Sequence, residues 1–261
     1  MVSRNTIKLI RSLEQKKYRQ RELLFVAEGP KVVGDLLTAG FAPHFLFATN
    51  EWSGAGEQQN RSLTWEEVSD DELRKLSFLQ HPQQVLAVFQ LPTANSQQSA
   101  RPVGALAQPV GTRIANSQQL YLVLDGVQDP GNLGTIIRLA DWFGIDTIFC
   151  SEDTADAWNP KVVQATMGSI ARVNVIYTDL ELLLSQTEMP VYGTLLDGEN
   201  IYGQRLTNNG FIVMGNEGNG ISPAIRSLIT RKLLIPKFHE GPESLNVAIA
   251  TAIVCSEFKR L

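Results

Sequence analysis

The stretch Leu124–Gly144, LDGVQDPGNLGTIIRLADWFG, decides the fold of the second half of this 261-residue chain. The apolar run at its start predicts a buried strand, and the glycines, proline and asparagine that follow predict a loop leading into a helix. The helix carries one apolar stripe, formed by Leu133, Ile136, Ile137 and Ala140. Arg138 lies near the opposite side, where position alone indicates a solvated charge. Because glycine allows close backbone approach and a helix N-terminus offers free N–H groups, the loop is a candidate binding site.

Strands and helices alternate on both sides of this stretch. In the first half, strands are expected over residues 23–29, 44–49 and 85–92, and helices over 4–20, 30–40 and 65–78. In the second half, strands are expected over residues 121–126, 147–151, 173–178, 191–196, 211–218 and 233–238, and helices over 132–144, 159–171, 222–229 and 243–260. This alternation predicts two α/β domains, residues 1–91 and 120–261. Residues 92–119, rich in Pro, Gln, Ser, Ala and Asn, are expected to form a linker.

The composition excludes several classes of protein. Apolar residues make up 43% of the chain and charged residues 19%, which excludes wholesale disorder and a disulfide-built scaffold. No apolar stretch approaches the ~20 residues that span a bilayer, and the N-terminus lacks the apolar core of a signal peptide. Cys150 and Cys255 match no metal-ligand spacing. We therefore expect a soluble, cytoplasmic protein without a metal or membrane partner.

Charge is distributed unevenly along the chain. Residues 1–31 hold eight basic and three acidic residues, whereas the whole chain has a net charge of −4. Such an asymmetry indicates a surface that attracts phosphate, and the alternative is an ordinary solvated helix face.

Two further segments hold glycine and polar residues beyond what packing needs. In Phe211–Ile221, FIVMGNEGNGI, a strand opens into a glycine-rich loop, where α/β proteins place ligands. Glu217 in this loop is a general base, a hydrogen-bond acceptor or merely an exposed turn acid. In Leu234–Arg260, Ser244 and Asn246 stand before an apolar helix, and an N-cap role explains one of them but not both.

Three motifs in this order resemble those of the SpoU (TrmH-like) ribose 2′-O-methyltransferases. They are D-P-x-N-x-G-x-x-x-R at 129–138, G-N-E-G-x-G-I at 215–221, and I-P at 235–236 followed by E-S-L-N-V-A-x-A at 243–250. The N-terminal half, with EGPKVVGDLL at 28–37 and HPQQVLAVFQ at 81–90, resembles the substrate-binding domain of the ribosomal-RNA branch. The family often has glycine where this chain has Gln84, so the end of that domain is a place of local difference.

The resemblance implies a fold and a cofactor. The fold is an N-terminal L30e-like α/β domain plus a C-terminal SPOUT α/β domain with a deep trefoil knot, and the cofactor is S-adenosylmethionine. The implied cofactor-binding residues are Thr194, Leu195, Gly215, Asn216, Glu217, Gly218, Ile221, Ile235, Pro236, Leu245 and Asn246. Backbone groups held in fixed loops suit the edge of an adenine ring.

The resemblance also implies RNA as the substrate and a set of reacting residues. The catalytic candidates are Arg138, Asn132, Glu217, Ser244 and Asn246, and the RNA-binding candidates are Arg4, Lys8, Arg11, Lys16, Lys17, Arg19 and Lys31. A guanidinium, with a pKa above ~12, is a poor base. We therefore expect Arg138 to stabilise the emerging alkoxide, with Asn132 fixing Arg138 or the ribose and Glu217 orienting Arg138.

Competing hypotheses remain at this point. Ribosomal RNA is favoured over tRNA because of the N-terminal domain. A catalytically silent RNA-binding protein of the same fold is disfavoured by the intact motif residues. A dehydrogenase is disfavoured because G-x-G-x-x-G is absent. The helix around Val247–Cys255 is apolar nearly all round, which predicts a homodimer through the C-terminal domain, as in the family, where Arg138 reaches the partner's active site.

Overall fold

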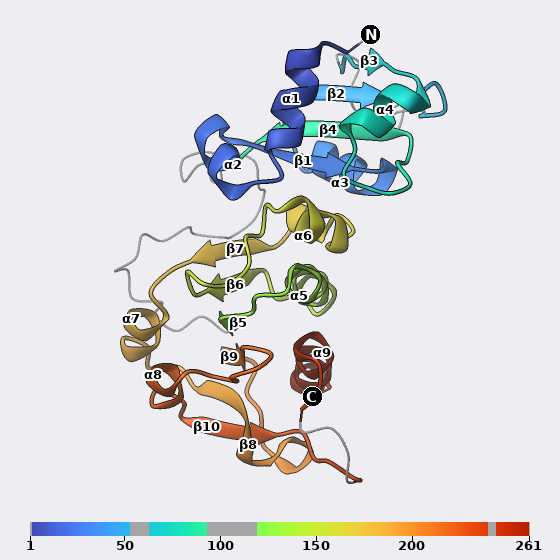
Figure 1. Cartoon of the computed structure of the whole chain (residues 1–261). Coiled ribbons are helices and arrows are strands. Elements are labelled where there is room, and N and C mark those ends of the chain that lie inside the picture. The colour runs from blue at the N-terminus through green and yellow to red at the C-terminus, as the bar shows by residue number, and fades with distance from the viewer. Residues whose placement is uncertain (1, 53–62, 93–118, 240–243, 261) are drawn as a thin grey trace. The chain divides into compact units, whose positions relative to one another are not determined.

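The computed structural model describes residues 2–52, 63–92, 119–239 and 244–260 (Figure 1). The chain divides into two compact units, each described here by itself. The first comprises Met1–Ala107 together with Asp156–Arg172, and the second comprises Gln108–Ala155 and Val173–Leu261. Of the predicted linker, residues 93–118 lie outside the described residues. Within the described ranges, no helix is long and apolar enough to cross a membrane.

The first unit is built on a mixed four-stranded sheet of order β1-β4-β2-β3. Its strands are β1 (Leu24–Glu28), β2 (Pro43–Ala48), β3 (Glu66–Glu67) and β4 (Val85–Gln90), and its helices are α1 (Arg4–Ser12), α2 (Lys16–Glu22), α3 (Pro30–Thr38), α4 (Asp70–Leu76), α6 (Pro160–Ala165) and the 3₁₀ turn η1 (Ser169–Ala171). Apolar side chains of α1 and α4 pack with the strands into one core, and α3 contacts β1 and β4. Ser69 and Glu72 form a capping box at the N-terminus of α4.

The single helix predicted over residues 4–20 is wrong, because the chain forms α1 and α2 with a break between them. The guanidinium of Arg19 donates to the backbone carbonyls of Leu13 and Glu14, each at 2.7 Å. A continuous helix would satisfy such carbonyls internally, and here a side chain does so instead. Arg19 therefore supplies the hydrogen bonds for two carbonyls at the break between α1 and α2.

Gln84 keeps the backbone conformation that glycine prefers. Its φ is +44°, in the left-handed region that most side chains avoid. At position 84 this chain therefore has a side chain that the family often lacks, but its backbone keeps a conformation that suits glycine.

The second unit is a six-stranded parallel sheet of order β10-β8-β9-β5-β6-β7. Its strands are β5 (Leu120–Asp125), β6 (Thr147–Cys150), β7 (Asn174–Tyr177), β8 (Val191–Asn200), β9 (Gly210–Gly215) and β10 (Arg231–Leu234). Its helices are α5 (Pro130–Trp142), α7 (Leu180–Ser185), α8 (Pro223–Arg226), α9 (Val247–Lys259) and the 3₁₀ turn η2 (Ile201–Gly203). Helix α7 was not predicted from the sequence.

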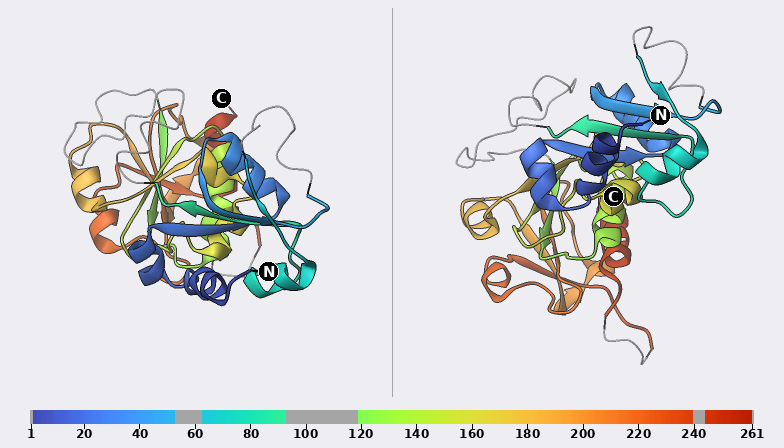
Figure 2. Two further views of the ribbon diagram at one scale, coloured as in Figure 1. Left: turned by 90° about the horizontal axis from the view of Figure 1, so that it is seen from above. Right: turned by 45° about the horizontal axis from the view of Figure 1, so that its top comes forward.

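Helices cover both faces of this parallel sheet, as such sheets require. In Figure 1, α5 and α9 lie side by side on one face while α7 and α8 lie on the other, and the views of Figure 2 agree on the pairing of α5 with α9. Leu180 and Leu184 of α7 and Ile225 of α8 are buried against Val213 and its neighbours in the strands. The α/β fold predicted from the sequence is confirmed for this unit.

Candidate functional site

Three polar side chains from separate motifs meet in the second unit. The amide nitrogen Nδ2 of Asn132 donates to Oε1 of Glu217 at 3.0 Å. The Nδ2 of Asn246 donates to Oδ1 of Asn132 at 2.9 Å. The sequence separations are 85 and 114 residues, so the fold alone brings these groups together. We call Asn132, Glu217 and Asn246 the amide–carboxylate network.

Strand pairing explains the first of these meetings. Strands β5 and β9 are parallel neighbours, and Asp125 pairs in register with Gly215 at their carboxyl ends. The loops that follow both strands therefore leave the sheet side by side. One carries Glu217, and the other enters α5, where Asp129 is the N-cap and its carboxylate accepts from the backbone N–H of Asn132 at 2.8 Å.

The network has a fixed direction. A carboxylate only accepts, so Asn132 presents its NH₂ group to Glu217 and its carbonyl to Asn246. Asn246 in turn uses its own carbonyl to cap α9, accepting from the N–H groups of Ala248 at 2.9 Å and Ile249 at 3.2 Å. The side-chain oxygen of Asn246 thus caps α9 while its side-chain nitrogen donates to Asn132. The residue can therefore fill both roles at once.

The loop that carries Glu217 is rigidly built. Asn216 and Gly220 form an antiparallel bridge, and the Asn216 side chain donates to Gly126 O at 2.7 Å while accepting from the N–H of Gly218 at 2.9 Å. A Cβ at Gly215 would stand 2.3 Å from the backbone of Gly220, so only glycine fits there. The polar atoms of Asn216 are therefore committed to shaping the loop.

The surroundings of Glu217 favour its charged form. Burial alone raises the pKa of this carboxyl, but hydrogen bonds from Asn132 and from the backbone of Gln128 and Asp129 outweigh it, and the pKa lies below its ordinary value of 4.5. Glu217 is therefore a hydrogen-bond acceptor and a poor proton acceptor at neutral pH.

This shift predicts a pH dependence of stability. A folded-state pKa below the unfolded value makes a contribution that is fully present above about pH 4.5 and is lost as pH falls through the folded pKa. Glu217→Gln is expected to remove this contribution, so its thermal midpoint falls less steeply than that of the wild type on acidification below pH 4.5. Melts from pH 7 to pH 3 measure this, and parallel curves for the two proteins would contradict it.

The candidate cofactor-binding residues lie along three neighbouring strands. Thr194 and Leu195 are in β8, Gly215 ends β9, and Ile235 and Pro236 follow β10 directly. Because β8, β9 and β10 are parallel, their carboxyl ends share one edge of the sheet. Gly218 lies in the Glu217 loop, Ile221 is buried after it, and Leu245 is half exposed just before Asn246. Ser244 is exposed beside them.

Arg138 stands apart from the network. It is exposed on α5, and within the described ranges its side chain forms no ion pair or hydrogen bond, so the expected contact with Glu217 is not made. Six residues of helix place it about 9 Å along the axis from Asn132 and on a different face. Arg138 is therefore not part of the hydrogen-bonded network within the described chain.

The basic segment holds most of its charges at the surface. The exposed candidates for RNA binding are Arg4, Lys8, Arg11, Lys16, Lys17 and Lys31. Arg19 is a correction, because it is only 2% exposed, is ion-paired with Asp156 and bonds the α1–α2 break, so it is unavailable to a phosphate. The sequence missed Arg21, which with Lys17 flanks the ring of Tyr18, each 4.8 Å from its centroid.

Comparison with known proteins agrees with the motifs. Residues 119–256 match the profile of the SpoU rRNA Methylase family, and residues 4–87 match an MRM3-like substrate binding domain. A 23S rRNA (guanosine(2553)-2′-O)-methyltransferase of Bacillus subtilis is 28% identical over 248 residues, which cover 94% of this chain and 92% of the relative.

Solved structures agree as well. A putative RNA methyltransferase of the TrmH family from Porphyromonas gingivalis is 39% identical, with a TM-score of 0.81 over 100% of this chain and 99% of that one. An AdoMet-bound rRNA methyltransferase from Sinorhizobium meliloti is 28% identical, with a TM-score of 0.80 over 100% and 97%. The predicted use of S-adenosylmethionine and the predicted RNA 2′-O-methyltransferase activity are confirmed. The chain belongs to the SpoU rRNA methylase family.

Proposed function

We propose that this enzyme methylates a ribose 2′-hydroxyl of ribosomal RNA. The observation that carries this is the amide–carboxylate network, which joins all three family motifs into one hydrogen-bonded group. The match of residues 4–87 to a substrate-binding domain favours ribosomal RNA over tRNA. Calorimetry tests the cofactor: S-adenosylmethionine should bind and NAD should not, and the reverse would overturn the proposal.

S-adenosylmethionine, when bound, supplies an activated methyl group. Thr194, Leu195, Gly215, Gly218, Ile221, Ile235, Pro236 and Leu245 are the residues proposed to hold it, together with the loop residues Asn216 and Glu217 and the cap residue Asn246. Their fit rests on the glycine-only approach at Gly215 and on the apolar side chains of Leu195 within β8 and Leu234 at the end of β10. Such loops present fixed backbone donors and acceptors to an adenine ring.

The protein residues position the ribose and stabilise charge. The 2′-hydroxyl must lose its proton as the methyl group is transferred, so negative charge develops on its oxygen. The guanidinium of Arg138 stabilises that oxygen electrostatically. Asn132 orients the ribose and is itself held by Glu217 and Asn246, with Ser244 beside them. Most of the rate enhancement then comes from alignment of donor and acceptor.

The active form is proposed to be a homodimer in which Arg138 serves the partner's network. Two observations support this. Arg138 is exposed, and among the described residues it makes no hydrogen bond or ion pair with the network of its own chain. Helix α9 also leaves an apolar stripe only partly covered, with Ile249 exposed by 53% and Ala252 and Ile253 half buried, while Trp142 at the end of α5 is 84% exposed. A monomer that is fully active at micromolar concentration would contradict the proposal.

The finer fold and the location in the cell belong to the same proposal. We take residues 1–91 as an L30e-like domain and residues 120–261 as a knotted SPOUT domain of a cytoplasmic protein. Support comes from the match of residues 119–256 to the SpoU rRNA Methylase family and from the TrmH-family structural neighbour.

The exposed basic residues of the first unit are proposed to bind RNA. Reversing the charges of Arg11, Lys16 and Lys17 is expected to weaken RNA binding at least tenfold at ~0.1 M salt and to flatten its salt dependence, because fewer counterions are released. Exchanging the charges of Arg74 and Asp71, an exposed ion pair on α4, leaves the net charge unchanged and serves as the control. Unchanged RNA affinity in the triple variant would mean that the segment is only a solvated helix face.

A further inference from the structure

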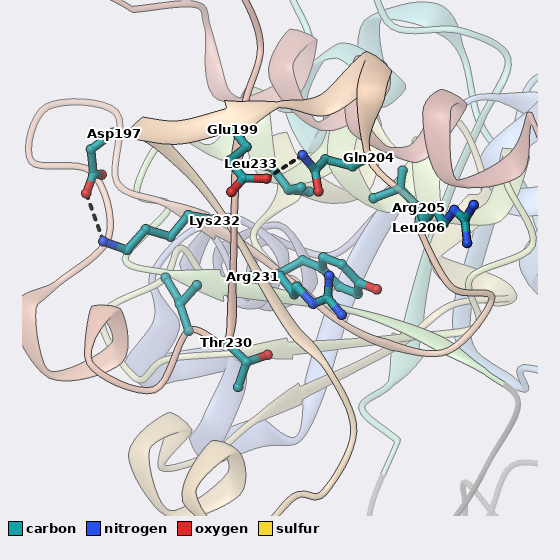
Figure 3. Close-up of a pocket in the computed structure, with 11 residues that line it drawn as sticks. Asp197, Glu199, Gln204, Arg205, Leu206, Thr230, Arg231, Lys232 and Leu233 are labelled. Atoms are coloured by element: carbon teal, nitrogen blue, oxygen red, sulfur yellow. Dashed lines mark hydrogen bonds and ion pairs between the residues drawn. The ribbon is translucent and has the colours of Figure 1, made fainter.

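A polar cavity of about 330 Å³ lies at the β8–β10 edge of the second unit (Figure 3). It shares no residue with the amide–carboxylate network. Its polar lining comes from the end of β8, the segment after η2 and the start of β10: Asp197, Glu199, Gln204, Arg205, Thr230, Arg231 and Lys232.

Both acidic side chains of this cavity have partners, and one of them is ion-paired. Asp197 accepts from Lys232 at 2.8 Å and from Arg226, just outside the lining, at 2.7 Å. Glu199 accepts from the Nε2 of Gln204 at 2.6 Å. Thr230 is also engaged, since its hydroxyl accepts from the N–H of Val191 at 2.9 Å. Glu199 keeps its negative charge, but the three basic side chains of the lining, Arg205, Arg231 and Lys232, outnumber the two acidic ones.

Arg205 and Arg231 are the charged side chains of this cavity that have no partner among the described residues. In Figure 3 dashed lines join Asp197 to Lys232 and Glu199 to Gln204, while none reaches either arginine. Both arginines are exposed, and among the described residues neither guanidinium has an ion-pair or hydrogen-bond partner. Each carries five N–H donors in a planar fork that matches the oxygens of a phosphate.

Positive charge is concentrated at this cavity although residues 120–261 are acidic as a whole. Residues 120–261 hold sixteen acidic and ten basic residues, and four of the ten, Arg205, Arg226, Arg231 and Lys232, gather at or beside this cavity. The same strands lead to the proposed cofactor loops, because β8 contains Thr194 and Leu234 at the end of β10 is followed by Ile235. A bound anion here would thus be held by the elements that position the cofactor.

We propose that Arg205 and Arg231 form a backbone-phosphate site for the RNA substrate, distinct from the basic segment of the first unit. The inference rests on RNA being the substrate. The site reads no base and fixes the position of the chain relative to the sheet edge. It is a binding site, so its loss weakens RNA binding and leaves cofactor binding intact.

The test compares Arg205→Gln/Arg231→Gln with Arg226→Gln in full-length protein. Arg226 lies beside the cavity but is paired with Asp197, so its removal changes nearby charge without removing a free fork. Binding of protein-free bacterial ribosomal RNA is titrated from 50 to 300 mM salt, and S-adenosylmethionine binding and thermal midpoint are measured alongside. We expect the double variant to bind RNA about tenfold more weakly at ~0.1 M salt, with a salt slope smaller by about 1, and the Arg226 variant to resemble the wild type.

Each other outcome is informative. A double variant that melts normally and binds RNA like the wild type overturns the inference. Binding of inorganic pyrophosphate is measured on the same variants, and its loss with RNA binding intact also overturns the inference, because the site then holds a small anion rather than RNA. If the double variant melts early, Arg205→Lys/Arg231→Lys decides: retained salt slope supports the inference, and a slope as flat as in the glutamine variant overturns it. Failure of the wild type to bind RNA would instead contradict the proposal that RNA is the substrate.

Discussion

Replacing Arg138 with lysine is expected to lower kcat by about 10²–10³-fold, the cost of removing one well-placed donor to a developing oxyanion. Lysine keeps the charge but loses the planar fork that contacts ribose and phosphate oxygens together. Arg138 is exposed and unpaired within the described ranges, so the substitution disturbs no internal contact and the thermal midpoint should stay unchanged. Single-turnover methyl transfer measures the effect.

The control and the contrary result for Arg138 are direct. Lys161→Arg is a matched exchange at an exposed helix position outside the network, and it should leave kcat unchanged. Near-wild-type turnover of Arg138→Lys would contradict the proposed role of Arg138 in stabilising the charge on the 2′-oxygen. Mixing Arg138→Lys subunits with Asn132→Ala subunits should restore up to about a quarter of wild-type activity if Arg138 acts across a dimer, since half of the dimers are mixed and each keeps one intact site.

Asn246→Asp is expected to keep the fold and lose the reaction. Asp retains the oxygen that caps α9, so the free energy of unfolding should stay within ~0.5 kcal/mol of the wild type. Its second oxygen replaces the NH₂ group that donates to Asn132, which sets two acceptors against each other 2.9 Å apart. Asn132 then turns or leaves Glu217, and negative charge is added beside the forming alkoxide. Methyl transfer should fall by at least ~10²-fold.

Asn246→Ala separates the two roles of this residue. Alanine removes both the helix cap and the hydrogen bond to Asn132. The free energy of unfolding should therefore fall by ~1 kcal/mol, and the rate of methyl transfer should fall as well. Thermal melts and single-turnover rates on the two variants decide the matter. Equal rates for Asn246→Asp and wild type would leave Asn246 as a helix cap alone.

The sequence predicted what local patterns encode. Apolar periodicity located most strands and helices. It also selected Asn132, Glu217 and Asn246. Their direct hydrogen bonds follow from the pairing of β5 with β9 and from the packing of α5 against α9, which no local pattern records.

Long-range contacts explain what the sequence missed. Arg19 resembles its basic neighbours in the sequence, yet a partner 137 residues away and two backbone carbonyls bury it. Arg205 and Arg231 belong to no motif, and they reach one cavity only because β10 pairs with β8. Strand 233–238 was placed too late, because Pro236 lacks the N–H that a paired strand needs and β10 ends at Leu234.

Mapping ribose methylations in total RNA from cells with and without the gene tests the central claim most directly. The account predicts that one 2′-O-methyl group disappears from ribosomal RNA in the deletion strain. The wild-type gene should restore it, and Arg138→Lys should not. Unchanged ribosomal RNA together with a lost ribose methylation in tRNA, or no lost methylation at all, would contradict it.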